Sequence, residues 1–81
     1  MLKIDQAFVK EIDASQPEND LTEPIISLVH KLGIATTAEG IETEEQMKYL
    51  IRSNCDYLQG YHLGRPVPKQ EAEEIVKRSL Q

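Results

Sequence analysis

Two carboxylates flank a glycine near the middle of this chain, and their types and spacing are what most suggest chemistry. Glu39 and Glu42 stand on either side of Gly40, after a short apolar run and before an amphipathic pattern. Paired carboxylates can act as a general acid and base, or they can hold a metal ion. Each also has a plain structural interpretation. Glu39 could be a solvated loop acid, and Glu42 could favour the positive N-terminus of the following helix.

Polar residues also close the other two short apolar runs of the sequence. Lys3 and Asp5 end the first run, and Gln59 ends the third. Functional residues of parallel α/β folds gather at the carboxyl ends of the strands, so we expect these side chains to meet Glu39 at one rim. Acids, a lysine and an amide there suit an anionic ligand held through Mg²⁺ or Mn²⁺. The alternatives are that Lys3 and Asp5 lie exposed on an edge strand and that Gln59 bonds neighbouring backbone.

The elements that must position these residues alternate along the sequence. Short strands are predicted over residues 2–5, 34–38 and 55–59, and helical periodicity follows each of them. This alternation predicts βα units on a parallel sheet. We therefore expect an α/β fold with three βα units. Three units are too few to close a barrel and would leave both sheet edges open, which suggests part of a larger fold.

Residues with known capping preferences mark the helix boundaries. Thr22 is the expected N-cap of the first long helix, and Gly33 should end it in the left-handed conformation. Thr43 and Gln46 fit a capping box at the start of the next helix, and Asn54 suits left-handed backbone at its end.

The remaining segments have weaker patterns. Residues 7–12 fit a single helical turn, and residues 13–20 are polar and turn-rich, so we expect a loop there. Pro66 and Pro68 should flank an extended turn before the last helix. That helix has an apolar stripe made of Ala72, Ile75, Val76 and Leu80.

Composition and charge exclude several classes of function. The 81 residues allow one domain, and their net charge of −5 argues against binding to nucleic-acid polymers or anionic membranes. No apolar run is long enough for a signal peptide or a membrane span. The single cysteine, Cys55, predicts a reducing compartment and is expected to be a small buried residue. His30 is expected at the surface or in a satisfied packing position, and His62 is ambiguous.

Four sequence blocks resemble one known family. LKID with FV (residues 2–9), TAEGIETEEQ (37–46), CDYLQGY (55–61) and RPVP (65–68) are similar in order and spacing to the C-terminal third of the bacterial EAL domain. The resemblance implies that residues 1–81 are the last three βα units of a TIM-like barrel. It further implies a cytoplasmic phosphodiesterase of second-messenger signalling, which hydrolyses cyclic di-GMP to linear pGpG with Mg²⁺ or Mn²⁺.

The same resemblance suggests catalytic roles for three residues. Lys3 matches the lysine that holds the catalytic water and contacts the phosphate region. Glu39 matches a glutamate assigned as a metal ligand or general base. Gln59 matches a glutamine close to water and substrate.

Other matched positions are expected to support the site or to bind substrate. Glu42 matches a supporting glutamate, and Asp5 matches a family position whose role stays open. Arg65 and Pro66 lie near the expected place of a guanine base.

Other parts of the family pattern are missing from this sequence. The Glu-Ala-Leu motif, the middle-strand asparagine and glutamate, and the paired aspartates are absent, and they supply most of the metal ligands in the family. We therefore expect the isolated chain to be inactive. We also expect either that it forms oligomers or that the N-terminal part of its barrel is missing. An alternative is a degenerate, non-catalytic EAL module that binds cyclic di-GMP or a protein partner. A third is an unrelated α/β interaction domain.

Overall fold

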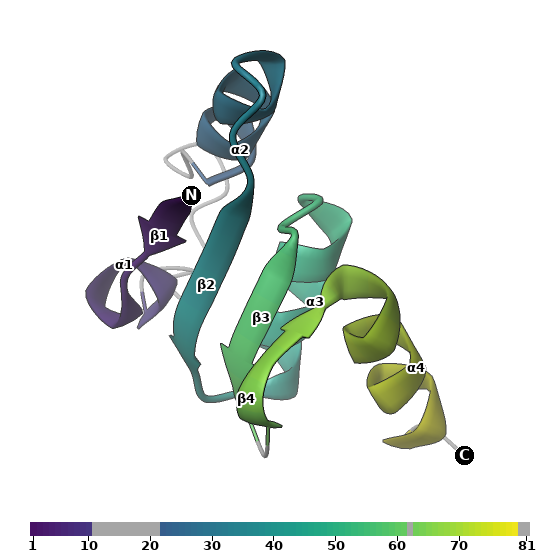
Figure 1. Ribbon diagram of the computed structural model, residues 1–81. Coiled ribbons are helices and arrows are strands. Elements are labelled where there is room, and N and C mark those ends of the chain that lie inside the picture. The colour runs from purple at the N-terminus through teal and green to yellow at the C-terminus, as the bar shows by residue number, and fades with distance from the viewer. Residues whose placement is uncertain (11–21, 62, 80–81) are drawn as a thin grey trace.

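The computed structural model describes residues 1–10, 22–61 and 63–79 (Figure 1). The loop expected over residues 13–20 lies outside these ranges, as do Ile12, His62 and Leu80. The described elements follow one another in the order β1 (Leu2–Ile4), α1 (Gln6–Lys10), α2 (Thr22–Lys31), β2 (Thr36–Ile41), α3 (Glu44–Arg52), β3 (Tyr57–Gly60), β4 (Leu63–Pro68) and α4 (Lys69–Ser79).

The described strands form one open sheet in the order β1-β2-β3-β4 (Figure 1). β1 pairs with β2 and β2 with β3 in parallel, whereas β3 and β4 are antiparallel. Helices directly follow β1 and β2, as βα units require, whereas β4 lies between β3 and α4. The α/β class and the unclosed sheet predicted from the sequence are therefore confirmed.

The fourth strand is a difference from the sequence-based expectation of an extended turn. The chain reverses after Gly60, and Leu58 pairs with Val67, whose side chain is buried. Pro66 and Pro68 belong to this strand. Proline cannot donate to a sheet, but it is tolerated on an edge strand, which is the position of β4 in the described sheet. Prolines therefore did not exclude a strand here.

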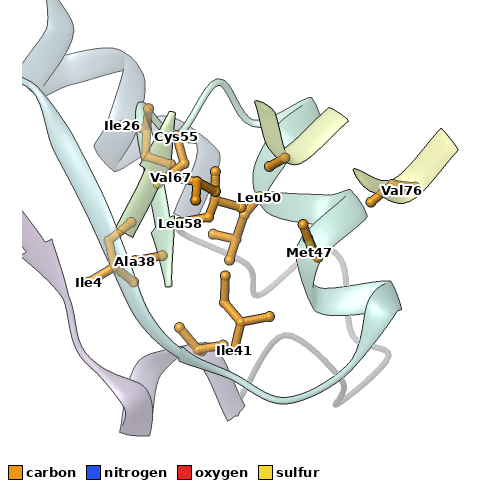
Figure 2. Packing of buried hydrophobic residues seen from close by; sticks show 12 residues of the cluster. Ile4, Ile26, Ala38, Ile41, Met47, Leu50, Cys55, Leu58, Val67 and Val76 are labelled. Atoms are coloured by element: carbon orange, nitrogen blue, oxygen red, sulfur yellow. The ribbon is translucent and has the colours of Figure 1, made fainter. Parts of the chain in front are cut away.

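The two faces of the sheet differ in character. Ile4, Ala38, Leu58 and Val67 lie on the face that the helices cover, where they pack with apolar side chains from α2, α3 and α4 (Figure 2). The helical members of this core are Val9, Ile26, Met47, Leu50, Ala72 and Val76. Side chains alternate along a strand, so the intervening residues must point to the other face. That other face carries Lys3, Glu39 and Gln59 of the predicted site.

Backbone conformation follows the capping predictions at two helix C-termini, whereas Thr22, expected as an N-cap, is instead the first helical residue of α2. Gly33 and Asn54 have φ of +75° and +68°, so both lie in the left-handed region. The Thr43 hydroxyl accepts from the Gln46 amide at 3.0 Å, and the Gln46 side chain accepts from the Thr43 amide at 3.2 Å. The capping box is therefore confirmed.

The Asp56 carboxylate links the amino ends of β2 and β3 to α2 through hydrogen bonds. Asp56 Oδ2 accepts from the Thr36 amide at 2.7 Å, from the Thr36 hydroxyl at 3.1 Å and from His30 Nε2 at 2.8 Å. Burial raises the pKa of Asp56, but the hydrogen bonds from Thr36 and His30 outweigh it, so the net pKa is lowered. The His30 side chain thus has a hydrogen-bond partner, as one of the two sequence-based interpretations predicted.

Removing this carboxylate should destabilise the fold in a pH-dependent way. Asp56→Ala should lower the free energy of unfolding by about 1–2 kcal/mol near pH 7, because a half-buried amide loses its acceptor while screening limits the charge contribution. The pKa is lower in the folded chain than in the unfolded chain. Ionised Asp56 therefore stabilises the fold above the ordinary value of 3.8, and this contribution is lost as the pH falls through the lowered pKa.

Urea unfolding of both proteins at neutral and acidic pH measures this effect. The difference between wild type and Asp56→Ala should shrink below about pH 4. Glu74→Gln, on the exposed side of α4, is the control and should behave like wild type. A difference that stays constant down to the lowest pH would contradict the assigned role of the Asp56 charge.

The single thiol should be inert in the folded chain. Cys55 is fully buried, its Sγ donates to the Tyr57 carbonyl at 3.3 Å, and burial raises the pKa of the thiol. The thiolate is the reactive form, so we expect alkylation in native buffer to be at least about 100-fold slower than in urea. Mass spectrometry after timed iodoacetamide treatment measures both rates, and equal rates would contradict this packing.

Candidate functional site

Lys3 and Glu39 form the centre of the candidate site. In the parallel register Lys3 lies opposite Thr37, so Glu39 follows two residues later on the same face of the sheet. Lys3 Nζ is 3.4 Å from Glu39 Oε1, and their side chains are 72% and 37% exposed. The ion pair therefore sits at the carboxyl ends of β1 and β2, within reach of a ligand from solvent.

A bulge in β2 presents Glu39 to this edge. Ala38 pairs with Leu58 and Ile41 with Gly60, so β2 uses one residue more than β3 over the same span. Gly40 has a φ of +73°, and a Cβ there would lie 2.5 Å from Gln6 Cγ. β2 also extends past Ala38, where the sequence suggested that it would end. Glu39 is thus held inside a strand that contacts α1, instead of in a free loop.

Gln59 shares the face and the end of the sheet with Lys3 and Glu39. Thr37 pairs with Tyr57, and Gln59 follows Tyr57 by two residues, as Glu39 follows Thr37. The Gln59 side chain is half-buried. The structure therefore brings the three residues expected to be catalytic onto neighbouring strands of one rim.

The two supporting acids lie beside this rim in different ways. Glu42 is exposed just after β2, and its backbone N–H donates to Gln46 Oε1 at 2.7 Å. Asp5 directly precedes α1, and its carbonyl accepts from the amides of Phe8 and Val9 at 2.9 and 3.0 Å. The turn that begins with Asp5 thus leads from the Lys3 strand into α1. The side-chain roles of both acids stay predictions.

Arg65 lies in a different environment from the Lys3–Glu39 pair. Val67 packs under the helices, and Arg65 shares its side of β4 by alternation. Arg65 Nη1 is 3.6 Å from Glu71 Oε2 on α4. Pro66 is exposed on the same strand. The structure does not bring Arg65 to the rim, and guanine binding by Arg65 and Pro66 stays a prediction.

Sequence reasoning missed the wider role of one residue near the site. Gln46 was identified only as half of a capping box, yet its Nε2 also donates to the Val9 carbonyl at 3.4 Å. These two residues lie 37 positions apart, and no local pattern connects them. Only the polarity of a residue on the packed face of α3 could have signalled a further partner.

The donor set offered by these residues fits part of a metal site. Glu39 supplies carboxylate oxygens of the kind that Mg²⁺ and Mn²⁺ prefer, and its side chain is open to solvent. Within the described ranges, no group of three or more His, Cys, Asp or Glu residues could hold a metal ion. Glu39 therefore fits as one ligand among others that this part of the chain does not provide.

None of the helices in the described part of the chain has both the length and the apolar character needed to cross a membrane.

Comparison with protein families decides which family shares this arrangement. Residues 1–66 match the family model of the EAL domain. The chain belongs to the EAL domain family. The resemblance seen in the four sequence blocks is thereby confirmed.

Individual relatives and a solved structure agree with membership of the EAL family. The chain is 37% identical over 76 residues to the cyclic di-GMP phosphodiesterase NbdA of Pseudomonas aeruginosa, covering 94% of the chain and 10% of that protein. It is 41% identical over 71 residues to the probable cyclic di-GMP phosphodiesterase PdeD of Escherichia coli, covering 88% of the chain and 13% of that protein. The chain thus spans about a tenth of the length of these curated relatives.

The fold of this EAL-family chain is shared with a crystal structure. The EAL domain of Mycobacterium smegmatis DcpA superposes with a TM-score of 0.67 and 31% sequence identity. The match covers 96% of this chain and 35% of the DcpA chain. The four-stranded sheet and its helices therefore correspond to one part of a larger EAL structure.

Proposed function

We propose that residues 1–81 form the C-terminal part of an EAL domain that hydrolyses cyclic di-GMP to linear pGpG in bacterial signalling. The observation that carries this proposal is the Lys3–Glu39 pair, 3.4 Å apart at the carboxyl ends of β1 and β2. Relatives named as cyclic di-GMP phosphodiesterases share most of this chain. The proposed compartment is the cytoplasm, which suits a chain with a single, buried cysteine.

Each residue of the rim has a distinct chemical task in this proposal. The Lys3 ammonium donates to a phosphate oxygen or to the attacking water and stabilises negative charge that develops on the phosphodiester. The Glu39 carboxylate orients that water by accepting a proton or by binding a cation. The Gln59 amide can accept from water and donate to a phosphate oxygen, which fixes their relative position.

A divalent cation is part of the proposed site. When bound, Mg²⁺ or Mn²⁺ supplies Lewis-acid stabilisation of the phosphodiester. Glu39 would hold it through a carboxylate oxygen, and the remaining ligands would come from elsewhere in a complete EAL domain. We therefore propose that residues 1–81 alone have no useful phosphodiesterase activity.

A cation-dependent titration tests this function. We would place residues 1–81 in the DcpA EAL domain in place of its matching segment, and follow cyclic di-GMP binding and pGpG formation with and without Mg²⁺. The proposal predicts binding with hydrolysis that requires the cation. Binding of cyclic di-GMP without turnover in either condition would support the sensing alternative instead, provided that the unaltered DcpA domain is active under the same conditions.

A further inference from the structure

The Gln46 side chain connects three segments around the site. It is 2% exposed on α3, although glutamine usually lies at the surface. Its Oε1 accepts from the backbone amides of Glu42 and Thr43, and its Nε2 donates to the Val9 carbonyl of α1. Helix capping accounts for the bond to Thr43. The bonds to Glu42 and Val9 go beyond it.

These two additional bonds reach the segments that carry Lys3 and Glu39. Glu42 directly follows β2 and its Glu39–Gly40 bulge, so fixing the Glu42 amide restrains the carboxyl end of β2. Val9 belongs to α1, which starts directly after the strand of Lys3. A second contact joins the same segments, because Gln6 of α1 fills the space where Gly40 lacks a side chain. α1 and the carboxyl end of β2 are therefore held together by two contacts, one through the Gln46 side chain and one between Gln6 and Gly40.

We propose that Gln46 is a positioning residue that sets the distance between Lys3 and Glu39. This inference rests on the proposed function of that pair. Replacing the Gln46 carboxamide would remove the acceptor of the Glu42 N–H and the donor to the Val9 carbonyl, and the bulge could then shift relative to β1. Gln46 itself does not touch the proposed ligand and acts only through these backbone groups.

The test compares Gln46→Met with Thr43→Ala in residues 1–81. Methionine fills a similar buried volume but removes both the acceptor oxygen and the donor nitrogen of the Gln46 carboxamide. Alanine at position 43 removes the hydroxyl that caps α3 and leaves the bonds from Gln46 to Glu42 and Val9 in place. The pair of variants thus separates helix capping from positioning of the bulge.

Two NMR readouts follow the site in these variants. Nuclear Overhauser contacts between the Lys3 and Glu39 side chains report their approach, and Mn²⁺ broadening of the Glu39 amide reports cation binding. In Gln46→Met the Overhauser contact should be lost, and the Mn²⁺ concentration for half-broadening should rise about 10-fold or more. Thr43→Ala should retain both within about twofold, since it leaves the Gln46 side-chain bonds intact.

Several results would overturn the positioning role. Equal losses of the Lys3–Glu39 Overhauser contact in both variants would show that Gln46 acts only as a helix cap. An unchanged Lys3–Glu39 contact in Gln46→Met would show that Gln46 does not position these residues. If Gln46→Met does not fold, Gln46→Glu decides, because it keeps the acceptor and loses the donor to Val9. It should then weaken the Lys3–Glu39 contact, and a wild-type contact would overturn the inference. If wild type shows no Mn²⁺ broadening, the metal-free Overhauser contact alone decides the role of Gln46, since the proposed function assigns the remaining cation ligands to other parts of the domain.

Discussion

Glu39→Gln should lower cyclic di-GMP hydrolysis at least about 100-fold in an EAL domain that carries residues 1–81 as its matching segment. The amide keeps the shape of the side chain but loses the charge that attracts a cation and the basicity that accepts a proton. The ion pair with Lys3 at 3.4 Å is lost as well. Initial rates of pGpG formation at saturating Mg²⁺ measure the effect.

Glu44→Gln is a matched control for this substitution. Glu44 lies five residues further along, in the first turn of α3, where it pairs with Lys48 at 3.6 Å on the helix surface. The same chemical change there should leave the hydrolysis rate within about twofold, because exposed ion pairs contribute little. A Glu39→Gln rate close to that of Glu44→Gln would remove Glu39 from the catalytic machinery.

Gly60→Ala should destabilise the chain by about 3 kcal/mol or more. Gly60 has a φ of +118°, a conformation that residues with a side chain rarely adopt. An added Cβ would also collide with the Ile41 carbonyl oxygen and amide nitrogen, and these backbone atoms cannot move aside as a side-chain end can. β2 and β3 would have to separate where the Glu39 bulge ends. Thermal or urea unfolding followed by circular dichroism measures the loss.

Gly64→Ala provides the corresponding control on the next strand. Apart from Gly64 and its two chain neighbours, no heavy atom of the described residues lies within 4 Å of the place where its Cβ would stand. The substitution should therefore change the free energy of unfolding by less than about 1 kcal/mol. If Gly60→Ala were as stable as Gly64→Ala, the close approach of β3 to the Ile41 backbone would be refuted.

Features set by local chemistry could be predicted from the sequence. Gly33 and Asn54 end their helices because they tolerate left-handed backbone, and Thr43 with Gln46 caps α3 through groups only three residues apart. The rim that carries Lys3, Glu39 and Gln59 was predictable for a related reason. Parallel strands place their carboxyl ends at one edge, so strand order alone brings such residues together.

Features that depend on contacts between distant segments could not be predicted. β4 forms because Val67 pairs with Leu58 of β3, although the two prolines in this segment suggested a turn. The Asp56 carboxylate accepts hydrogen bonds from His30 and Thr36, which lie 26 and 20 residues away in the sequence. No periodic pattern predicts these bonds. Arg65 was expected to lie near a guanine base from its position in the RPVP block. Its ion pair with Glu71 of α4 depends on the pairing of β4, which the sequence did not predict, and guanine binding by Arg65 stays a prediction.

The central claim is that this chain supplies one side of a phosphodiesterase site, with Lys3 and Glu39 at its rim. The most direct test measures pGpG release from cyclic di-GMP with Mn²⁺ by residues 1–81 alone and by the DcpA EAL domain that carries them. We predict no release above background from the isolated chain and sustained release from the complete domain. Turnover by the isolated chain, or none by a folded complete domain that binds cyclic di-GMP, would contradict the claim.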